Sequence, residues 1–121
     1  MINAELLVGT LHDLDRNRAE WRQSQWRSCF AARAAILDGG EWAFPELDLW
    51  WLTARDDDPD DDVRMVNAKR RGKKVRCVHV RDRAARVLGL DGDQADRLFF
   101  STNGLPRLYT IVSDLCEEAA A

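Results

Sequence analysis

Aromatic and charged residues gather in the middle of the chain. Trp50 and Trp51 are adjacent, residues 56–62 read Asp-Asp-Asp-Pro-Asp-Asp-Asp, and six of the eight residues in 69–76 are cations. Tryptophan and arginine often carry much of the binding energy in protein interfaces. Since adjacent side chains of a strand point to opposite faces, one indole is expected outside the core. The sequence therefore predicts a non-enzymatic protein-binding surface within residues 47–76, although flanking helices that cover both indoles would fit the pattern equally well.

The basic segment supports an alternative function, nucleic-acid binding. Cations on a loop can follow a phosphate backbone while a neighbouring indole stacks on a base. The net charge of −3 disfavours a free DNA-binding domain, which is usually basic. In a further interpretation, the acids of 56–62 pair loosely with the cations and only keep the surface solvated. The predicted binding residues are Trp50, Trp51, Lys69, Arg70, Arg71, Lys73, Lys74 and Arg76.

The cysteines and histidines suggest a thiol enzyme as a second alternative. Cys29 would act as the nucleophile if His12 or His79 lay close enough to deprotonate it. Cys29 also precedes an apolar run, Phe-Ala-Ala, so a buried structural thiol is the stronger interpretation. Cys77 and His79 share one face of a predicted strand, but two ligands do not complete a metal site. We therefore predict no catalytic residue, no metal and no cofactor.

Helical signals dominate the first forty residues. Asn3 is a good N-cap, and leucines at positions 7, 11 and 14 predict a helix from Asn3 to about Arg18. A second helix is expected to begin near residue 24 or 28, to run through an alanine-rich segment to Asp38, and to end at Gly39 and the glycine after it.

The middle of the chain predicts a small sheet. Residues 47–53 are rich in aromatic and apolar side chains, and residues 63–66 and 75–80 alternate incompletely between apolar and polar types. Gly72 lies between the last two segments, which favours a β-hairpin with a long basic loop. The acidic run is expected to lead into this hairpin.

Three helices are expected in the last forty residues. The first covers residues 83–88 between a cap at Asp82 and Gly89, and the second is capped by Asp91 or Asp93. The third carries a proline at position 106, in its first turn, where a missing N–H has no cost. Its expected core face comprises Leu105, Leu108, Ile111, Val112 and Leu115.

A chain of 121 residues is long enough for one domain. We predict a single, mostly helical α+β domain over residues 1–121, with about five helices and a small antiparallel β-hairpin or three-stranded sheet. Residues 1–40 would hold the N-terminal helices, 41–80 the strands with the acidic and basic loops, and 81–121 the C-terminal helices.

The sequence predicts that the protein is located in the cytoplasm. Three cysteines, an odd number, argue against a closed disulfide framework. The chain has neither an apolar stretch of about 18 residues nor the basic start of a signal peptide. We therefore expect no membrane partner.

Parts of the chain resemble a known group of proteins. The segments concerned are residues 26–35, Gly39-Gly40, 78–80, 84–90, 95–99, Asn103 and 108–115. They are similar to small uncharacterised proteins of actinobacteria and their phages, although this chain has Ala32-Arg33 where the group tends to have Gly-Trp. The resemblance implies an actinobacterial or phage source, a mostly helical fold and, for a phage protein, a host protein as partner in the host cytoplasm. It implies no catalytic residues.

Overall fold

The computed structural model describes residues 1–68 and 73–120. Within this part of the chain it contains five α-helices, one short 3-10 helix and three strands, which confirms the predicted α+β class. In chain order the elements are α1 (Ala4–Arg16), α2 (Phe30–Leu37), β1 (Trp51–Thr53), η1 (Asp60–Asp62), β2 (Val63–Val66), β3 (Val75–His79), α3 (Val80–Leu88), α4 (Gly92–Phe99) and α5 (Leu105–Ala120).

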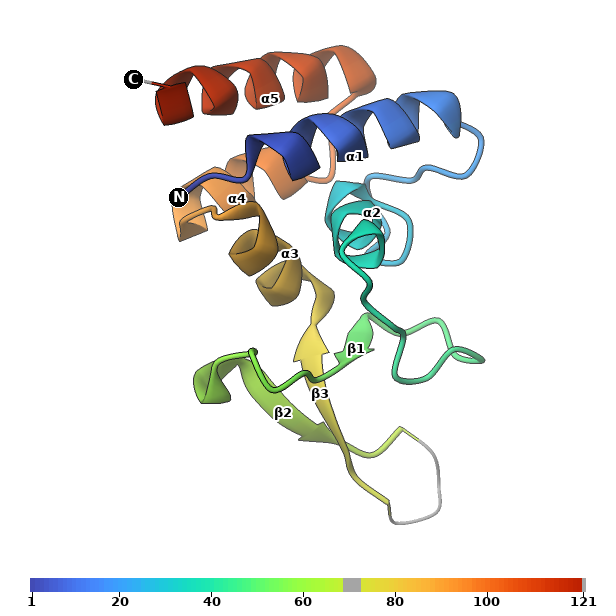
Figure 1. The fold of residues 1–121 in the computed structure, drawn as a ribbon. Coiled ribbons are helices and arrows are strands. Elements are labelled where there is room, and N and C mark those ends of the chain that lie inside the picture. Colours follow the sequence, from blue (N-terminus) through green and yellow to red (C-terminus); the bar gives the residue numbers. More distant parts are fainter. Residues whose placement is uncertain (69–72, 121) are drawn as a thin grey trace.

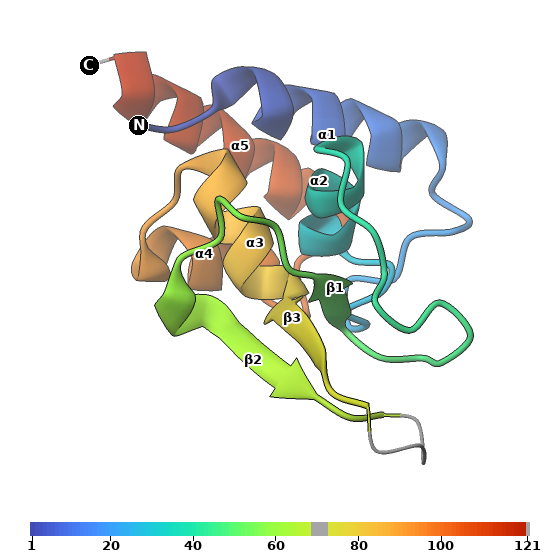
Figure 2. The ribbon, with the colours of Figure 1, turned by 60° about the horizontal axis from the view of Figure 1, so that its bottom comes forward.

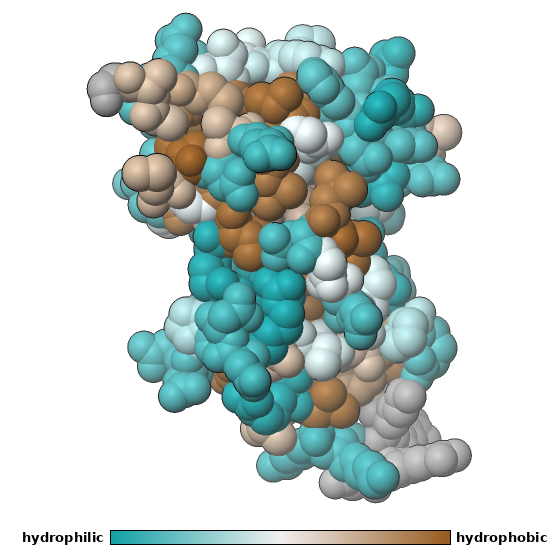
Figure 3. Space-filling view, viewed as in Figure 1, coloured by the Kyte–Doolittle hydropathy of each residue, from teal (hydrophilic) through white to brown (hydrophobic). Residues whose placement is uncertain are grey.

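The helices lie at one end of the molecule and the sheet at the other (Figure 1). Helices α1 and α5 run side by side in both ribbon views, with α2, α3 and α4 between them and the sheet (Figure 2). The predicted core face of α5 is largely confirmed, because Leu108, Ile111, Val112 and Leu115 are buried while Leu105 is half-buried. On the face drawn in Figure 3, hydrophobic residues gather over the helical end, and hydrophilic residues dominate the sheet end.

The helix boundaries follow local hydrogen bonds. Asn3 caps α1 as predicted, since its side-chain oxygen accepts the N–H of Leu6 at 3.1 Å. Helix α2 begins at Phe30, later than predicted, because the side chain of Gln23 accepts the Phe30 N–H at 3.1 Å and holds the preceding segment in turns. Asp91 caps α4 in a capping box, which confirms the first of the two predicted caps.

The passage from β3 to α3 corrects the prediction for this segment. Val80 was expected to end a strand and Asp82 to cap the helix, but α3 already begins at Val80 and its cap is His79. The Val80 N–H still donates to the carbonyl of Trp50 at 3.0 Å, as in a sheet. The next N–H, of Arg81, donates instead to Nδ1 of His79 at 3.0 Å, so the imidazole replaces the missing helical acceptor.

The sheet has the order β1-β3-β2, and both pairings are antiparallel. In the register, Trp51 lies opposite His79 and Leu52 opposite Val78. Strand β1 is shorter than the predicted 47–53, since only Trp51–Thr53 pair with β3. The outer edge of β1 is covered by the preceding segment, where Trp42 forms a bridge with Leu52.

Candidate functional site

Three tryptophans surround one histidine at the junction of the sheet and the helices. We call Trp26, Trp50, Trp51 and His79 the tryptophan cluster. Trp26 meets the imidazole edge-on, with ring centroids 5.0 Å apart, and Trp51 does so at 5.8 Å. Trp50 lies 6.2 Å from the imidazole and 6.4 Å from Trp51. Edge-on and tilted pairs at these distances are attractive, so the four rings hold one another in place.

The two adjacent indoles do not separate as the sequence suggested. Trp50 lies just before β1 rather than in it, so the alternation of side chains along a strand does not apply to this pair. Both rings join the cluster, but Trp50 remains 39% exposed whereas Trp51 is half-buried. The indole of Trp50 is therefore partly open to solvent while it packs against two other rings.

The position of Trp26 depends on a buried glutamine that the sequence analysis did not single out. Oε1 of Gln23 accepts the indole N–H of Trp21 at 3.0 Å, as well as the N–H of Phe30. Its amide nitrogen donates to the carbonyls of Leu98 and Phe100, at 3.1 and 3.3 Å. Gln23 thus ties the segment that carries Trp26 to the end of α4. Only the folded chain reveals these partners, because they lie more than seventy residues away in the sequence.

Trp26 lines two hollows. The small hollow, of about 220 Å³, lies between Trp26 and Trp50 and is also lined by Asp48. The large hollow, of about 310 Å³, extends from Trp26 to Phe100, which is 60% exposed. The hollows share Ser24 and Trp26 in their linings, so they are neighbours. Together they form a surface with an exposed aromatic residue at each end.

His79 is neutral in this arrangement. Its Nδ1 accepts the Arg81 N–H, which leaves the proton on Nε2. Burial lowers the pKa of His79 below its ordinary value, and Arg81 adds to this effect against the opposing influence of Asp82. The imidazole therefore serves as a helix cap and as a partner of the three indoles.

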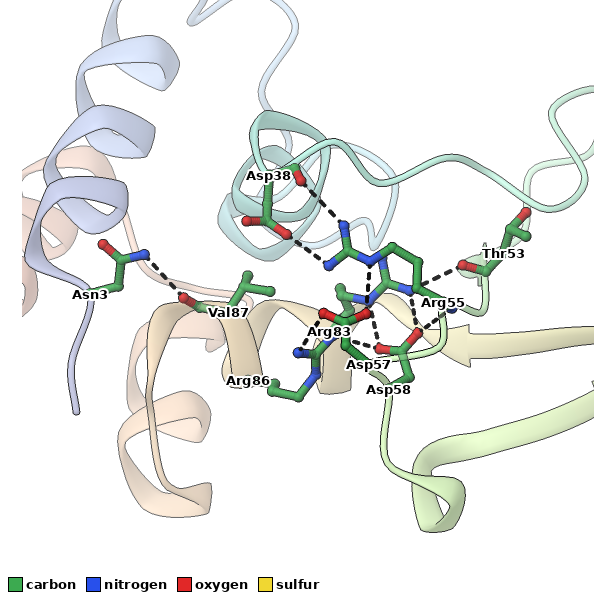
Figure 4. Close-up of polar contacts among 9 residues, drawn as sticks. All are labelled: Asn3, Asp38, Thr53, Arg55, Asp57, Asp58, Arg83, Arg86 and Val87. Atoms are coloured by element: carbon green, nitrogen blue, oxygen red, sulfur yellow. Dashed lines mark hydrogen bonds and ion pairs between the residues drawn. The ribbon is translucent and has the colours of Figure 1, made fainter.

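Two acids of the acidic run pair with arginines outside the basic hairpin. Asp58 is buried and receives hydrogen bonds from Arg83 and Arg86 of α3, each at 2.8 Å, and a second one from Arg83 (Figure 4). Asp57 forms ion pairs with Arg55 and Arg86. The interpretation in which these acids pair with the basic loop is thus wrong for Asp57 and Asp58, because their partners are arginines of α3 and of the loop before η1.

The structure describes three of the six cations in the predicted basic site. Lys69, Arg70 and Arg71 lie outside the described residues. Lys73, Lys74 and Arg76 are exposed, and no ion pair joins them to the described part of the chain. Their charge is available to a partner.

The candidate nucleophile Cys29 lacks the surroundings of a reactive thiol. Cys29 is 1% exposed, its Sγ contacts the carbonyl of Trp26, and burial raises its pKa. A buried thiol with a raised pKa is a poor nucleophile at neutral pH. His79, one of the two bases considered, is engaged with Arg81 and the indoles. Among the residues that the structure describes, no group of three or more potential ligands could hold a metal ion.

Comparison with family models, curated proteins and solved structures found no match. In the described ranges, no helix combines the length and apolar character needed to cross a membrane.

Proposed function

We propose that this protein binds another protein, without catalysis, through the tryptophan cluster and the two hollows beside it. The observation that carries this proposal is Trp50, an indole that is 39% exposed although two other rings, Trp51 and His79, pack against it. Ordering a flexible side chain on binding is costly, and a ring that is already held avoids much of this cost. Exposed tryptophans next to cavities are frequent hot spots.

The surface is wider than the segment 47–76 on which the sequence analysis placed it. It includes Trp26 from the segment between α1 and α2, and Phe100 after α4. A partner would insert side chains into the small hollow and the large hollow, both of which Trp26 lines. The resemblance to actinobacterial and phage proteins makes a protein of an actinobacterial host the partner to test first.

The test uses a photo-crosslinking residue at Ser24, which lines both hollows. A protein captured from an actinobacterial lysate is identified, produced and titrated against the purified chain. Trp50→Ala is expected to weaken binding roughly 30-fold, the loss of a typical hot spot. Tyr109→Ala removes an aromatic ring of the same 39% exposure from α5 and should leave the affinity unchanged. Equal affinities for Trp50→Ala and the wild type would refute the proposal.

A second candidate function is nucleic-acid binding. The ion pairs that two arginines of α3 form with the acidic run support it. Because Arg83 and Arg86 engage Asp57 and Asp58, these acids do not offset the charge of Lys73 and Lys74. Cations without an ion pair are suited to the phosphates of a single-stranded backbone.

A salt series with a labelled single-stranded oligonucleotide tests this second candidate. Binding should weaken steeply as salt rises, and Lys73→Glu/Lys74→Glu should abolish it. The control, Arg16→Glu/Arg107→Glu, makes the same change in net charge at exposed positions of α1 and α5. No binding at low salt, or equal loss in both double variants, would exclude this function.

A further inference from the structure

The small hollow between Trp26 and Trp50 carries a charge as well as two aromatic walls. Asp48 lines it, is exposed, and has no ion pair with any described residue. The other charged residue of the lining is Arg27. If Arg27 neutralised Asp48, the hollow would be suited to an apolar group. The chemistry of the occupant therefore depends on whether Asp48 or Arg27 is available to bind it.

Arg27 is engaged elsewhere. Its guanidinium lies over the ring of Trp42, 4.5 Å from the centroid. Its Nη1 donates to the carbonyls of Phe44 and Leu47. These contacts hold the cation against the 42–47 segment, and the carboxylate of Asp48 remains without a cation of its own. Arg27 keeps its charge but is held by neutral partners, so Asp48 is the charged group of the lining that is left to bind an incoming side chain.

The size of the small hollow is suited to a side chain rather than to a whole metabolite. Its volume of about 220 Å³ lies below the range of roughly 300–1,000 Å³ that is common for small-molecule sites. Indoles are the aromatic rings that attract cations most strongly, and a carboxylate at the rim adds a charge-assisted hydrogen bond. An acidic group would be repelled by Asp48.

We propose that the small hollow receives a cationic side chain, arginine or lysine, from the protein partner. The cation would lie against Trp26 and Trp50, with its N–H groups directed to Asp48. The inference rests on the proposed protein-binding function and names the chemistry by which that surface recognises its partner. The large hollow differs, because Phe99 and Phe100 line it together with the ion pair of Arg81 and Asp96.

The experiment uses blocked amino acids rather than an unidentified protein. The indole N–H signals of the labelled protein are followed by NMR at pH 7.5 during titration with N-acetylarginine methylamide, the lysine analogue, the citrulline analogue and the glutamate analogue. Citrulline keeps the shape of arginine and removes its charge. We expect saturable shifts of the Trp26 and Trp50 signals with arginine or lysine, and at least about fivefold weaker binding of citrulline.

Three variants test whether the arginine analogue binds in the small hollow. Asp48→Asn is expected to weaken arginine binding about threefold to tenfold, by loss of the ionic partner. Asp56→Asn makes the same charge change at an exposed acid that does not line the small hollow, and should leave binding unchanged. Trp50→Ala should abolish the shift at Trp26.

Three outcomes would overturn the inference: no saturable shift, equal affinity for arginine and citrulline, or equal effects of Asp48→Asn and Asp56→Asn. Its failure can be separated from that of the proposed function. If the captured protein loses affinity for Trp50→Ala while arginine does not bind, only the cationic occupant is wrong. If arginine binds while Trp50→Ala leaves the affinity for the protein unchanged, the proposed function itself is wrong.

Discussion

Single residues of the same type have different roles in this molecule. Asp58 is enclosed with Arg83, whose residue is 1% exposed, so its charge is used entirely within the fold. Asp48 is exposed without an ion pair to the described residues. Both acids belong to the predicted binding region 47–76, yet one secures the sheet to α3 and the other is available for binding. Burial and partners decide between these roles.

Removing Asp58 should destabilise the fold strongly. Asp58→Ala leaves the buried guanidinium of Arg83 without its anion, and breaking a buried pair in this way costs about 3–5 kcal/mol. Asp61→Ala, at an exposed acid three positions along the chain, should change the free energy of unfolding by less than about 0.5 kcal/mol. Urea unfolding at pH 7 measures both. Similar values for the two variants would contradict the importance of this pair.

Acid should weaken the same contact. Burial on its own raises the pKa of Asp58, but hydrogen bonds from Arg83, the Arg55 N–H and Arg86 outweigh it and hold the pKa well below its usual range. Because the unfolded state binds the proton more readily, this contribution is complete above about pH 5 and is lost as the pH falls toward 2. The wild-type melting temperature should therefore fall more steeply over this range than that of Asp58→Ala. Parallel curves would show that Asp58 does not carry the effect.

At the scale of elements, β3 and α3 are joined without a loop, and His79 serves both. It pairs with Trp51 across the sheet and caps α3 through Arg81. His79 therefore joins the sheet to α3 at the tryptophan cluster, in addition to the anchor that Asp58 forms with Arg83 and Arg86.

His79 should make stability depend on pH in a second, higher range. Its pKa is lowered by burial, so protonation favours the unfolded state as the pH falls from about 7.5 to 5.5. His79→Asn keeps a side-chain acceptor at the cap but cannot be protonated, and its melting temperature should vary less over this range. His12→Asn, at an exposed position of α1, should behave like the wild type. A wild-type curve as flat as that of His79→Asn would contradict this role.

Gly89 ends α3 in a conformation that other residues avoid. Its φ is +72°, and a Cβ there would lie 1.9 Å from the carbonyl oxygen of Met1. Gly89→Ala should therefore cost well over the roughly 1 kcal/mol expected from backbone strain alone. Gly39→Ala, with a φ of +91° but open space around it, should cost only about that amount. Thermal unfolding compares the two variants, and equal losses would show that the contact with Met1 is unimportant.

Elements set by neighbouring residues were predictable, and contacts between distant residues were not. Asn3, Gly89 and the Asp91 cap act on residues within a few positions, so their types identify helix ends. Asp58 and Arg83 are 25 residues apart, and nothing in either residue type selects the other. The boundary at Val80 was missed because histidine is an unusual cap. Of the site, Trp50 and Trp51 were predicted, whereas Trp26 entered it through the fold.

Considered as a whole, the molecule combines a helical end rich in buried residues with a sheet end that has few. Four residues of α1 are buried, whereas none of the four residues of β2 is fully buried. Trp51, Arg76 and His79 belong to strands of the sheet, and Trp50 directly precedes β1. The edge strand β2, which has no fully buried residue, is therefore expected to open more readily than the helical core.

Hydrogen exchange should reveal this division. Amides of α1 and α2 are expected to exchange only through global unfolding, because their side chains form the core. The amides of β2 that bond to β3 should exchange roughly 100-fold faster, since β2 is an edge strand that opens without exposing buried side chains. In Asp58→Ala the β3 amides should approach the rates of β2, because the anchor between the sheet and α3 is lost. Amides of β2 as slow as those of α1 would instead show that sheet and helices unfold as one unit.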